Sequence, residues 1–275
     1  GHTRRLAQAV GSRGRVISVD ADAAAIARVR PTMVGLPIEL VHANFRDLPT
    51  VLQSLGIEAV DAILVDLGLS SDQLADRERG FSYLADGPLD LRFDITSGSP
   101  ASQWLQQLDE RELADLIYRF GEERASRRIA REIVRERSNA QAWTATRLAR
   151  LVSRCVPRSP NHAIHPATRT FQALRIAVNG ELEALELLLR ESPGLLKPSG
   201  WLAVISFHSL EDRRVKEAFR DDPRWQSITR KPIRPTEEET AANPRSRTAR
   251  LRIAARAEAT TARPQPVAPK RFFGA

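Results

Sequence analysis

The chain has 275 residues, 42% of them hydrophobic, and a formal net charge of +8 at pH 7. This hydrophobic content supports a packed core and excludes a wholly disordered chain, and the basic balance favours a polyanionic partner. One cysteine, Cys155, excludes an internal disulfide and fits a reducing compartment. No apolar run reaches transmembrane length, so we expect a soluble, cytoplasmic protein that makes no membrane contact.

The first hundred residues predict alternating strands and helices. Short apolar, β-branched runs predict strands at Arg15–Asp20, Ile38–Ala43 and Asp61–Asp66. Helical patterns lie between them, at Ala21–Arg30, which Pro31 should end, and at Leu48–Gly56. This alternation is typical of βαβ units and a parallel sheet.

Beyond Pro100 the pattern becomes helical. Leu108–Arg137 predicts two helices broken at Gly121, and Thr144–Val156 predicts a third. A further long helix is predicted from Pro166 to about Leu189, with apolar residues at helical spacing.

The strand pattern returns at Trp201–Ser206, followed by a helix at Leu210–Arg220 and strands near Trp225–Thr229 and Arg250–Ala254. A proline- and charge-rich loop parts these last two strands. We therefore expect an α/β domain in two parts (1–97 and 166–258), an inserted all-helical domain (98–165) and a disordered tail (259–275).

Carboxylates and an aromatic residue follow the predicted strands, where ligands bind in parallel sheets. Asp20 ends the first predicted strand and can hold ribose hydroxyls, or be a solvated strand end. Asp66 can face the same crevice or cap the next helix, and Phe45 can stack on a purine-like ring or belong to the core. Counting back about twenty residues from Asp20, the usual distance to a glycine loop, reaches Gly1 and His2, so we expect the sequence to begin inside that loop, after a first strand.

A long polar loop follows Asp66 and contains "RGFSYLADGPLDLRFD". Loops of this length without structure are usually functional or disordered. The aromatic and leucine residues within it argue against disorder, and predict the rim of an active site.

Five segments in chain order resemble one family, the ribosomal RNA small subunit methyltransferase H family. They are "DLGLSSDQL", "RGFSYLADGPLDLRFD", "HPATRTFQALRIAVNGEL", "SFHSLEDRRVK" and "NPRSRTARLR", and the opening "GHT" looks like the end of that family's glycine loop. The resemblance implies a class I (Rossmann-like) methyltransferase sheet with an inserted helical domain. It implies transfer of a methyl group from S-adenosylmethionine to a cytosine N4 amine of 16S rRNA, in the decoding region of the small ribosomal subunit.

The resemblance also implies roles for single residues. The cofactor site would comprise Gly1, His2, Asp20, Phe45, Asp66 and Gln73. Asp66 is our candidate acceptor for the target amine, with the backbone or hydroxyls of Gly68–Ser71 as the second choice. Residues expected to contact the RNA are Arg79, Phe81, Tyr83, Arg92, His165, Arg169 and His208.

Other features suggest no second chemistry. Carbon-5 methylation would need a cysteine nucleophile, but Cys155 lies in the helical block and reads as a buried small hydrophobe. No metal is expected, because His162, His165 and His208 lack zinc-ligand spacing. Arg124, Arg128, Arg131 and Arg135 are predicted to share one helix face, opposite Ile129 and Ile133, and could follow a phosphate backbone or form an ordinary solvated face.

Two alternatives remain at this stage. A nicotinamide-dependent dehydrogenase would also use Asp20 to hold a ribose, but leaves the five matched segments unexplained. A non-catalytic RNA-binding or ribosome-assembly factor is the other. A homodimer is also compatible with the sequence.

Overall fold

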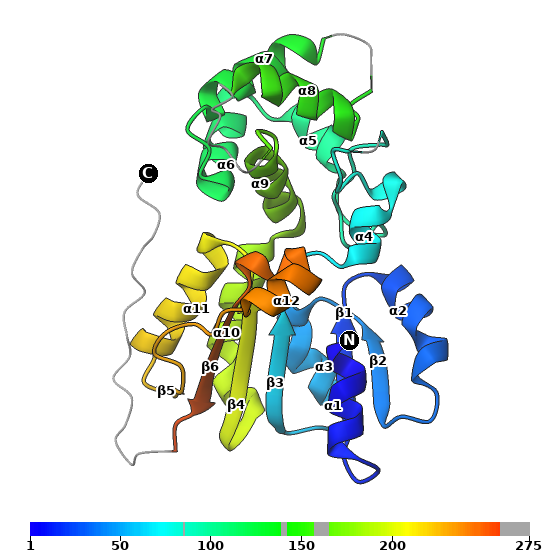
Figure 1. Ribbon diagram of the computed structural model, residues 1–275, viewed down its shortest axis with the longest axis vertical. Coiled ribbons are helices and arrows are strands. Elements are labelled where there is room, and N and C mark those ends of the chain that lie inside the picture. The colour runs from blue at the N-terminus through cyan, green and yellow to red at the C-terminus, as the bar shows by residue number, and fades with distance from the viewer. Residues whose placement is uncertain (85, 139–141, 157–164, 259–275) are drawn as a thin grey trace.

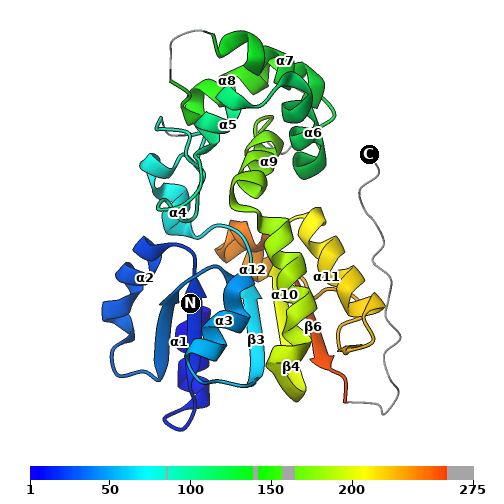
Figure 2. The same cartoon turned by 180° about the vertical axis from the view of Figure 1, so that it is seen from behind.

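The computed structural model describes residues 1–84, 86–138, 142–156 and 165–258. His162 and the predicted tail lie outside these ranges. The chain forms a sheet domain and a helical layer stacked on one end of it (Figures 1 and 2). Within the described ranges, no helix has both the length and the apolarity needed to cross a membrane.

The strands confirm the predicted α/β pattern. β1 and β2 form a parallel pair, while the other strands form a sheet in the order β3-β4-β6-β5. β3 and β4 are parallel, whereas β6 runs antiparallel to both of its neighbours. The described strands are β1 Val16–Asp20, β2 Ile38–His42, β3 Val60–Asp66, β4 Leu196–Ser206, β5 Trp225–Ser227 and β6 Arg250–Arg256.

Helices cover the sheet because their apolar sides pack against the β-branched and leucine side chains of the strands. Leu185 and Leu189 of one helix and Val215 and Phe219 of another join the buried core around Val204 of β4. These outer helices are α1 His2–Val10, α2 Ala23–Val29, α3 Leu48–Ser54, α10 Glu181–Leu195 and α11 Ser209–Asp221.

Pro31 ends the α-helix as predicted, since α2 stops at Val29 with Arg30 as its C-cap. Pro31 then lies at the start of the 3₁₀ helix η1 (Arg30–Met33), where a missing N–H is tolerated. One local prediction about this domain was wrong. The proline- and charge-rich loop before β6 contains a short helix, α12 (Glu237–Ala242), capped by the Thr236 side chain.

The helical layer consists of α5 Ala101–Gln107, α6 Glu110–Gly121, α7 Ser126–Glu136, α8 Ala145–Cys155 and α9 Thr168–Asn179. The predicted break at Gly121 is confirmed, and it has a packing reason. A Cβ atom at Gly121 would lie 2.5 Å from the Arg169 carbonyl oxygen, so only glycine lets α6 and α9 approach this closely. The buried core of this layer extends beyond residues 98–165, since it also includes Phe81 and Leu91 before them and Phe171 after them.

The long helix predicted from Pro166 to Leu189 is in fact two helices. Gly180, with φ = 57°, ends α9 and turns the chain into α10. α10 continues past Pro193 to Leu195, and β4 begins at Leu196 rather than at Trp201. The apolar spacing correctly predicted that both segments are helical. It did not indicate that Gly180, in a left-handed backbone conformation, separates them.

The predicted arginine face on α7 is shorter than expected. Ile129 and Ile133 are fully buried, as predicted, and Arg128, Arg131 and Arg135 are exposed. Because α7 begins at Ser126, however, Arg124 lies outside the helix.

Candidate active site

The strands β1, β2, β3 and β4 end on the side of the sheet domain that faces the helical layer (Figure 1). Asp20 ends β1, His42 ends β2 and Asp66 ends β3. Gly1 and His2 lie at the same end, because α1 begins there and places His2 Nδ1 3.4 Å from an Asp66 carboxylate oxygen. The fold therefore brings four of the predicted cofactor-site residues to one edge of the sheet.

The pKa values of Asp20 and Asp66 are both raised. Partial desolvation by surrounding protein raises the pKa of Asp20, against the opposing effect of the Asp22 N–H, which donates to its carboxylate at 2.8 Å. Desolvation likewise raises the pKa of Asp66, and the neighbouring His2 opposes this. The Asp66 side chain is nevertheless 49% exposed. A carboxylate that is reachable and has a raised pKa is suited to accept a proton from a ligand.

The alternative role of Asp66, as a helix cap, is wrong. α4 (Ser71–Ala75) is capped by Ser70, whose hydroxyl accepts from the Gln73 N–H at 3.1 Å. In return, Gln73 Oε1 accepts from the Ser70 N–H at 2.9 Å, which completes a capping box.

Phe45 begins the 3₁₀ helix η2 (Phe45–Asp47), directly after β2. Its ring is half-buried and packs against the core of the sheet domain. Asn44 fixes this turn, since its side chain accepts from the Arg46 N–H at 3.0 Å. The packing role of Phe45 is thus observed, while its contact with a cofactor stays a prediction.

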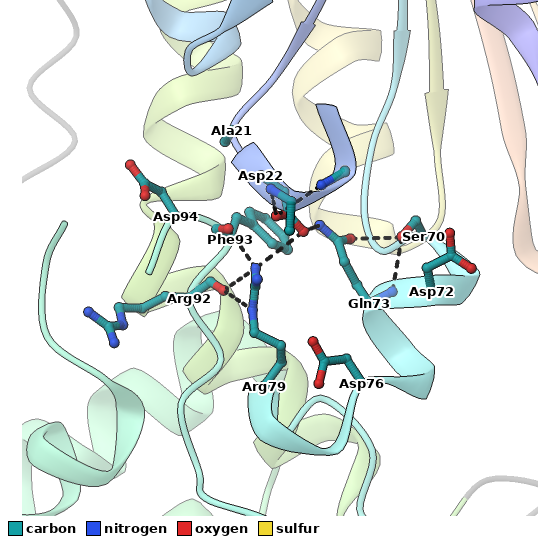
Figure 3. Close-up of polar contacts among 12 residues, drawn as sticks. Ala21, Asp22, Ser70, Asp72, Gln73, Asp76, Arg79, Arg92, Phe93 and Asp94 are labelled. Atoms are coloured by element: carbon teal, nitrogen blue, oxygen red, sulfur yellow. Dashed lines mark hydrogen bonds and ion pairs between the residues drawn. The ribbon is translucent and has the colours of Figure 1, made fainter. Parts of the chain in front are cut away.

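A buried polar network joins the end of β1 to the long loop (Figure 3). Asp22 lies at its centre and is almost fully buried. One carboxylate oxygen of Asp22 caps α2, and the other accepts from Gln73 Nε2 at 2.9 Å and lies 3.4 Å from Arg79 Nη2. Burial alone would raise the pKa of Asp22, but the Gln73 hydrogen bond and the Arg79 charge outweigh it and lower that pKa.

Arg79 links this network to the far side of the loop. Its guanidinium donates to the carbonyl oxygens of Arg92 (3.0 Å) and Phe93 (2.6 Å), whereas the Arg92 side chain points away (Figure 3). The adjacent Gly80 has φ = 67°, and a Cβ atom there would lie 2.2 Å from the Pro88 carbonyl oxygen. Only glycine fits this position, so the loop is a tightly closed structure.

Asn179, at the end of α9, fixes the same loop from the helical layer. Its side-chain oxygen accepts from the Phe93 N–H at 2.7 Å, and its amide donates to the Leu91 carbonyl at 2.7 Å. Leu91 is buried and has φ = 64°, a conformation that costs a non-glycine residue energy. The surrounding contacts hold this strained residue in place.

Most of the predicted RNA-contacting side chains have partners within the chain. Phe81 is buried, and the Tyr83 ring stacks on His165 with centroids 4.4 Å apart. Arg92 makes a two-point ion pair with Asp90, at 2.8 and 2.7 Å. Their predicted contacts with RNA remain untested, but Phe81 is a core residue in this structure.

The remaining predicted contacts differ in exposure. Arg169 is exposed, and its guanidinium lies 3.4 Å from the Glu122 carbonyl oxygen. His165 is also exposed, although its Nδ1 accepts from the Ala167 N–H at 3.2 Å. The His208 ring is largely buried, with Nε2 3.0 Å from a carboxylate oxygen of Glu211.

The sequence analysis missed Asp22 and Asn179. Asp22 carries a helix-capping signal, because it directly precedes the alanine-rich run of α2. Its second role depends on partners 51 and 57 residues away, which no local pattern indicates. Asn179 likewise acts on backbone groups more than 80 residues earlier. Within the described ranges, no three His, Cys, Asp or Glu side chains gather as metal ligands would.

Comparison with known proteins agrees with this architecture. Residues 1–257 match the MraW methylase family. A protein from Rhodopirellula baltica named ribosomal RNA small subunit methyltransferase H is 53% identical, over 94% of this chain and 83% of the relative. Proteins of the same name from Thermomicrobium roseum (49% identical, 93% and 84% covered) and Sorangium cellulosum (48% identical, 93% and 81% covered) also match. The sheet and its helices form the predicted Rossmann-like methyltransferase fold, and the chain belongs to the MraW methylase family.

Proposed function

We propose that the protein transfers a methyl group from S-adenosylmethionine to the N4 amine of a cytidine in the decoding region of 16S rRNA, within the small ribosomal subunit in the cytoplasm. The names of its relatives support ribosomal RNA as the substrate class. The observation that carries the proposal is Asp66, a reachable carboxylate with a raised pKa at a strand end, beside the residues suited to a nucleotide-like cofactor.

The residues at the strand ends fit the chemistry of this cofactor. One Asp20 oxygen accepts from the Asp22 N–H, and within the described residues the other has no hydrogen-bond partner, so it is available to ribose hydroxyls. Phe45 offers a half-buried ring for the adenine, and Gly1 and His2 lie next to Asp66. When bound, S-adenosylmethionine supplies a methyl group activated by a positive sulfur.

Gln73 would serve this site indirectly. Both ends of its side-chain amide are engaged, one with the Ser70 N–H and the other with Asp22. By holding Asp22, Gln73 fixes the turn whose N–H positions the Asp20 carboxylate. Gln73 would therefore support Asp20, the ribose-binding residue, through Asp22.

The target amine needs an acceptor because its lone pair is delocalised into the cytosine ring. During transfer the nitrogen forms a bond to the methyl carbon, the carbon–sulfur bond breaks, and the amine loses a proton. Asp66 can hold the amine through a hydrogen bond, favour its pyramidal form and take that proton. The hydroxyls among the alternative acceptors, in Gly68–Ser71, already have partners. The Ser70 hydroxyl caps α4, and the Ser71 hydroxyl accepts from Arg245.

We also propose that the helical layer recognises the RNA. The exposed arginines of α7 (Arg128, Arg131 and Arg135) can contact phosphates. The loop that contains Arg79 and Phe93 connects this layer to the strand ends, since Arg79 contacts Asp22 after β1 and Asn179 of α9 accepts from the Phe93 N–H. A base bound under this loop would be close to both cofactor and acceptor.

Incubation with labelled S-adenosylmethionine and small subunits that lack the modification tests the proposal. We expect one methyl group per subunit, mapped to the N4 position of a decoding-region cytidine. Tight binding to subunits without transfer would favour an assembly factor. Methylation at carbon 5, or on a different RNA, would contradict the assigned amine chemistry.

A further inference from the structure

A base taken out of an RNA strand needs a flat surface to stack on, and the loop aromatics that the sequence suggested are engaged elsewhere. Phe81 is in the core of the helical layer. Tyr83 stacks on His165 and packs edge-on against Phe171, with centroids 5.5 Å apart. The third loop aromatic, Phe93, packs against the same core, with its ring centroid 5.8 Å from that of Phe81. We therefore look for the stacking surface on another element.

Phe207 lies beside Asp66 at the carboxyl end of the neighbouring strand. In the parallel pair of β3 and β4, Asp66 is opposite Ile205, and the Leu67 N–H donates to the Ile205 carbonyl at 3.0 Å. Phe207 follows two residues later, just beyond the end of β4. Its position along the sheet is therefore level with the residues directly after Asp66.

The Phe207 ring is not part of the packed interior. It is half-buried and belongs to none of the three hydrophobic clusters found among the described residues. A Cβ atom at Gly68 would lie 3.5 Å from Phe207 Cδ2, so the ring lies against the backbone of the segment after Asp66. Gly68 has φ = 91° and no side chain, so this neighbour places no side chain over the ring.

The backbone of Phe207 is held by a buried carboxylate. Glu211, in the first turn of α11, accepts from the Phe207 N–H at 2.8 Å and the His208 N–H at 3.3 Å. Glu211 is almost fully buried, and the His208 ring and the Arg175 charge both favour its ionised form. This anchoring gives the aromatic residue a fixed position, which a stacking surface requires.

We propose that Phe207 is the surface on which the target base stacks while its amine faces Asp66. The inference rests on the proposed function for the identity of the base, and identifies the ligand of Phe207 as a planar nucleobase extruded from RNA. Stacking on an aromatic ring is worth roughly 1–3 kcal/mol per base, equivalent to about 5- to 150-fold in rate. Because phosphate contacts provide most of the affinity for RNA, the loss should appear in the transfer step.

Four variants test this role. Phe207→Ala and Phe207→Leu remove the ring, the latter with little loss of apolar volume, and Phe207→Tyr keeps it. Trp201→Ala is the matched control, since Trp201 is an aromatic residue 55% exposed on β4, away from the carboxyl end of that strand. We expect the single-turnover methylation rate on unmodified small subunits to fall about 5- to 150-fold in the first two variants. The Phe207→Tyr and Trp201→Ala variants should stay within about twofold of the original chain, all variants binding S-adenosylmethionine with unchanged affinity.

An RNA hairpin with pyrrolocytidine in its loop gives a readout that needs no methyl transfer, because the fluorescence of this base falls on stacking. We expect the original chain and Phe207→Tyr to quench it, and Phe207→Ala and Phe207→Leu not to. Phe207-dependent quenching without methylation by the original chain would overturn the proposed function and keep the role of Phe207. Unchanged rates and quenching in Phe207→Ala, or a loss confined to cofactor affinity, would overturn the inference.

Discussion

Asp22 and Asp66 are carboxylates at the same end of the sheet domain, yet they differ in exposure and in their hydrogen-bond partners. The Asp22 side chain is 3% exposed and has partners from α2, α4 and the long loop. The Asp66 side chain is 49% exposed, and His2 Nδ1 lies 3.4 Å from one of its carboxylate oxygens. The pKa of Asp22 is lowered by its partners, and the pKa of Asp66 is raised by desolvation.

The difference separates two uses of one residue type. A buried carboxylate with a full set of donors is fixed in its charged form and joins segments of the chain. A reachable carboxylate that the protein desolvates without enough donors has capacity left for a ligand. On this ground we propose that Asp66 takes part in the chemistry, whereas Asp22 belongs to the frame that positions Asp20 and the loop.

The largest expected effect is the loss of stability on replacing Asp22. Asp22→Ala leaves Arg79 buried without its carboxylate, and breaking a buried ion pair costs about 3–5 kcal/mol of unfolding free energy. Denaturant unfolding measures this loss. Asp72→Asn is the control, because Asp72 is 65% exposed in its ion pair with Arg28 and should cost no more than about 1 kcal/mol. Equal losses in both variants would show that Asp22 is not a structural centre.

The second prediction concerns Asp66→Asn, which keeps the shape of the side chain and loses its charge. Loss of a hydrogen bond to a charged group costs about 1.5–3 kcal/mol, or roughly ten- to a hundredfold in single-turnover rate. Folding should survive, because desolvation already disfavours the charged form of Asp66. Asp61→Asn, at the other end of β3 and 85% exposed, is the matched control and should keep full activity. A normal rate in Asp66→Asn would remove this residue from the mechanism.

The pH dependence distinguishes Asp66 from Asp22, because their pKa values are shifted in opposite directions. The transfer rate should fall as pH drops through the raised pKa of Asp66, which lies above the ordinary value for aspartate of about 3.9. The stabilising contribution of Asp22 is present above that ordinary value and is lost only as pH falls further, through its lowered pKa. Just above the ordinary value, activity should therefore decline by up to about tenfold per pH unit while the fold remains intact. Rates and unfolding curves measured over the same pH series test this, and Asp66→Asn should flatten the activity decline.

The sequence predicted the elements whose cause is local. Alternating apolar runs indicated β1, β2 and β3, and the spacing of Ile129 and Ile133 indicated the buried side of α7. Strand ends were also predictable, because parallel strands present their carboxyl ends at one edge. The sequence therefore indicated that Asp20 and Asp66 lie at the same end of the strands.

The rest could not be predicted, because it depends on partners distant in sequence. Arg79 reads as an exposed arginine in a polar loop, but it is buried between Asp22 and the carbonyl of Phe93. No sequence signal singled out Phe207, because only the packing of β4 beside β3 places it against Gly68. Charge and aromaticity identified residues with a special role, but tertiary structure decided which of them face a ligand.

The smallest expected effect on the transfer rate comes from replacing Cys155. This variant tests whether the chemistry is confined to the strand ends around Asp66. Cys155 ends α8, is buried in the core of the helical layer, and has a pKa raised by desolvation, so its thiol is protonated and unreactive at neutral pH. Methylation at an exocyclic amine needs no covalent adduct with the base. Cys155→Ala should therefore leave the single-turnover rate within about twofold and cost about 1 kcal/mol of stability for the lost packing. If the folded variant loses all methyl transfer while Asp66→Asn keeps it, the reaction uses a thiol nucleophile, and the assignment of the chemistry to the strand ends is wrong.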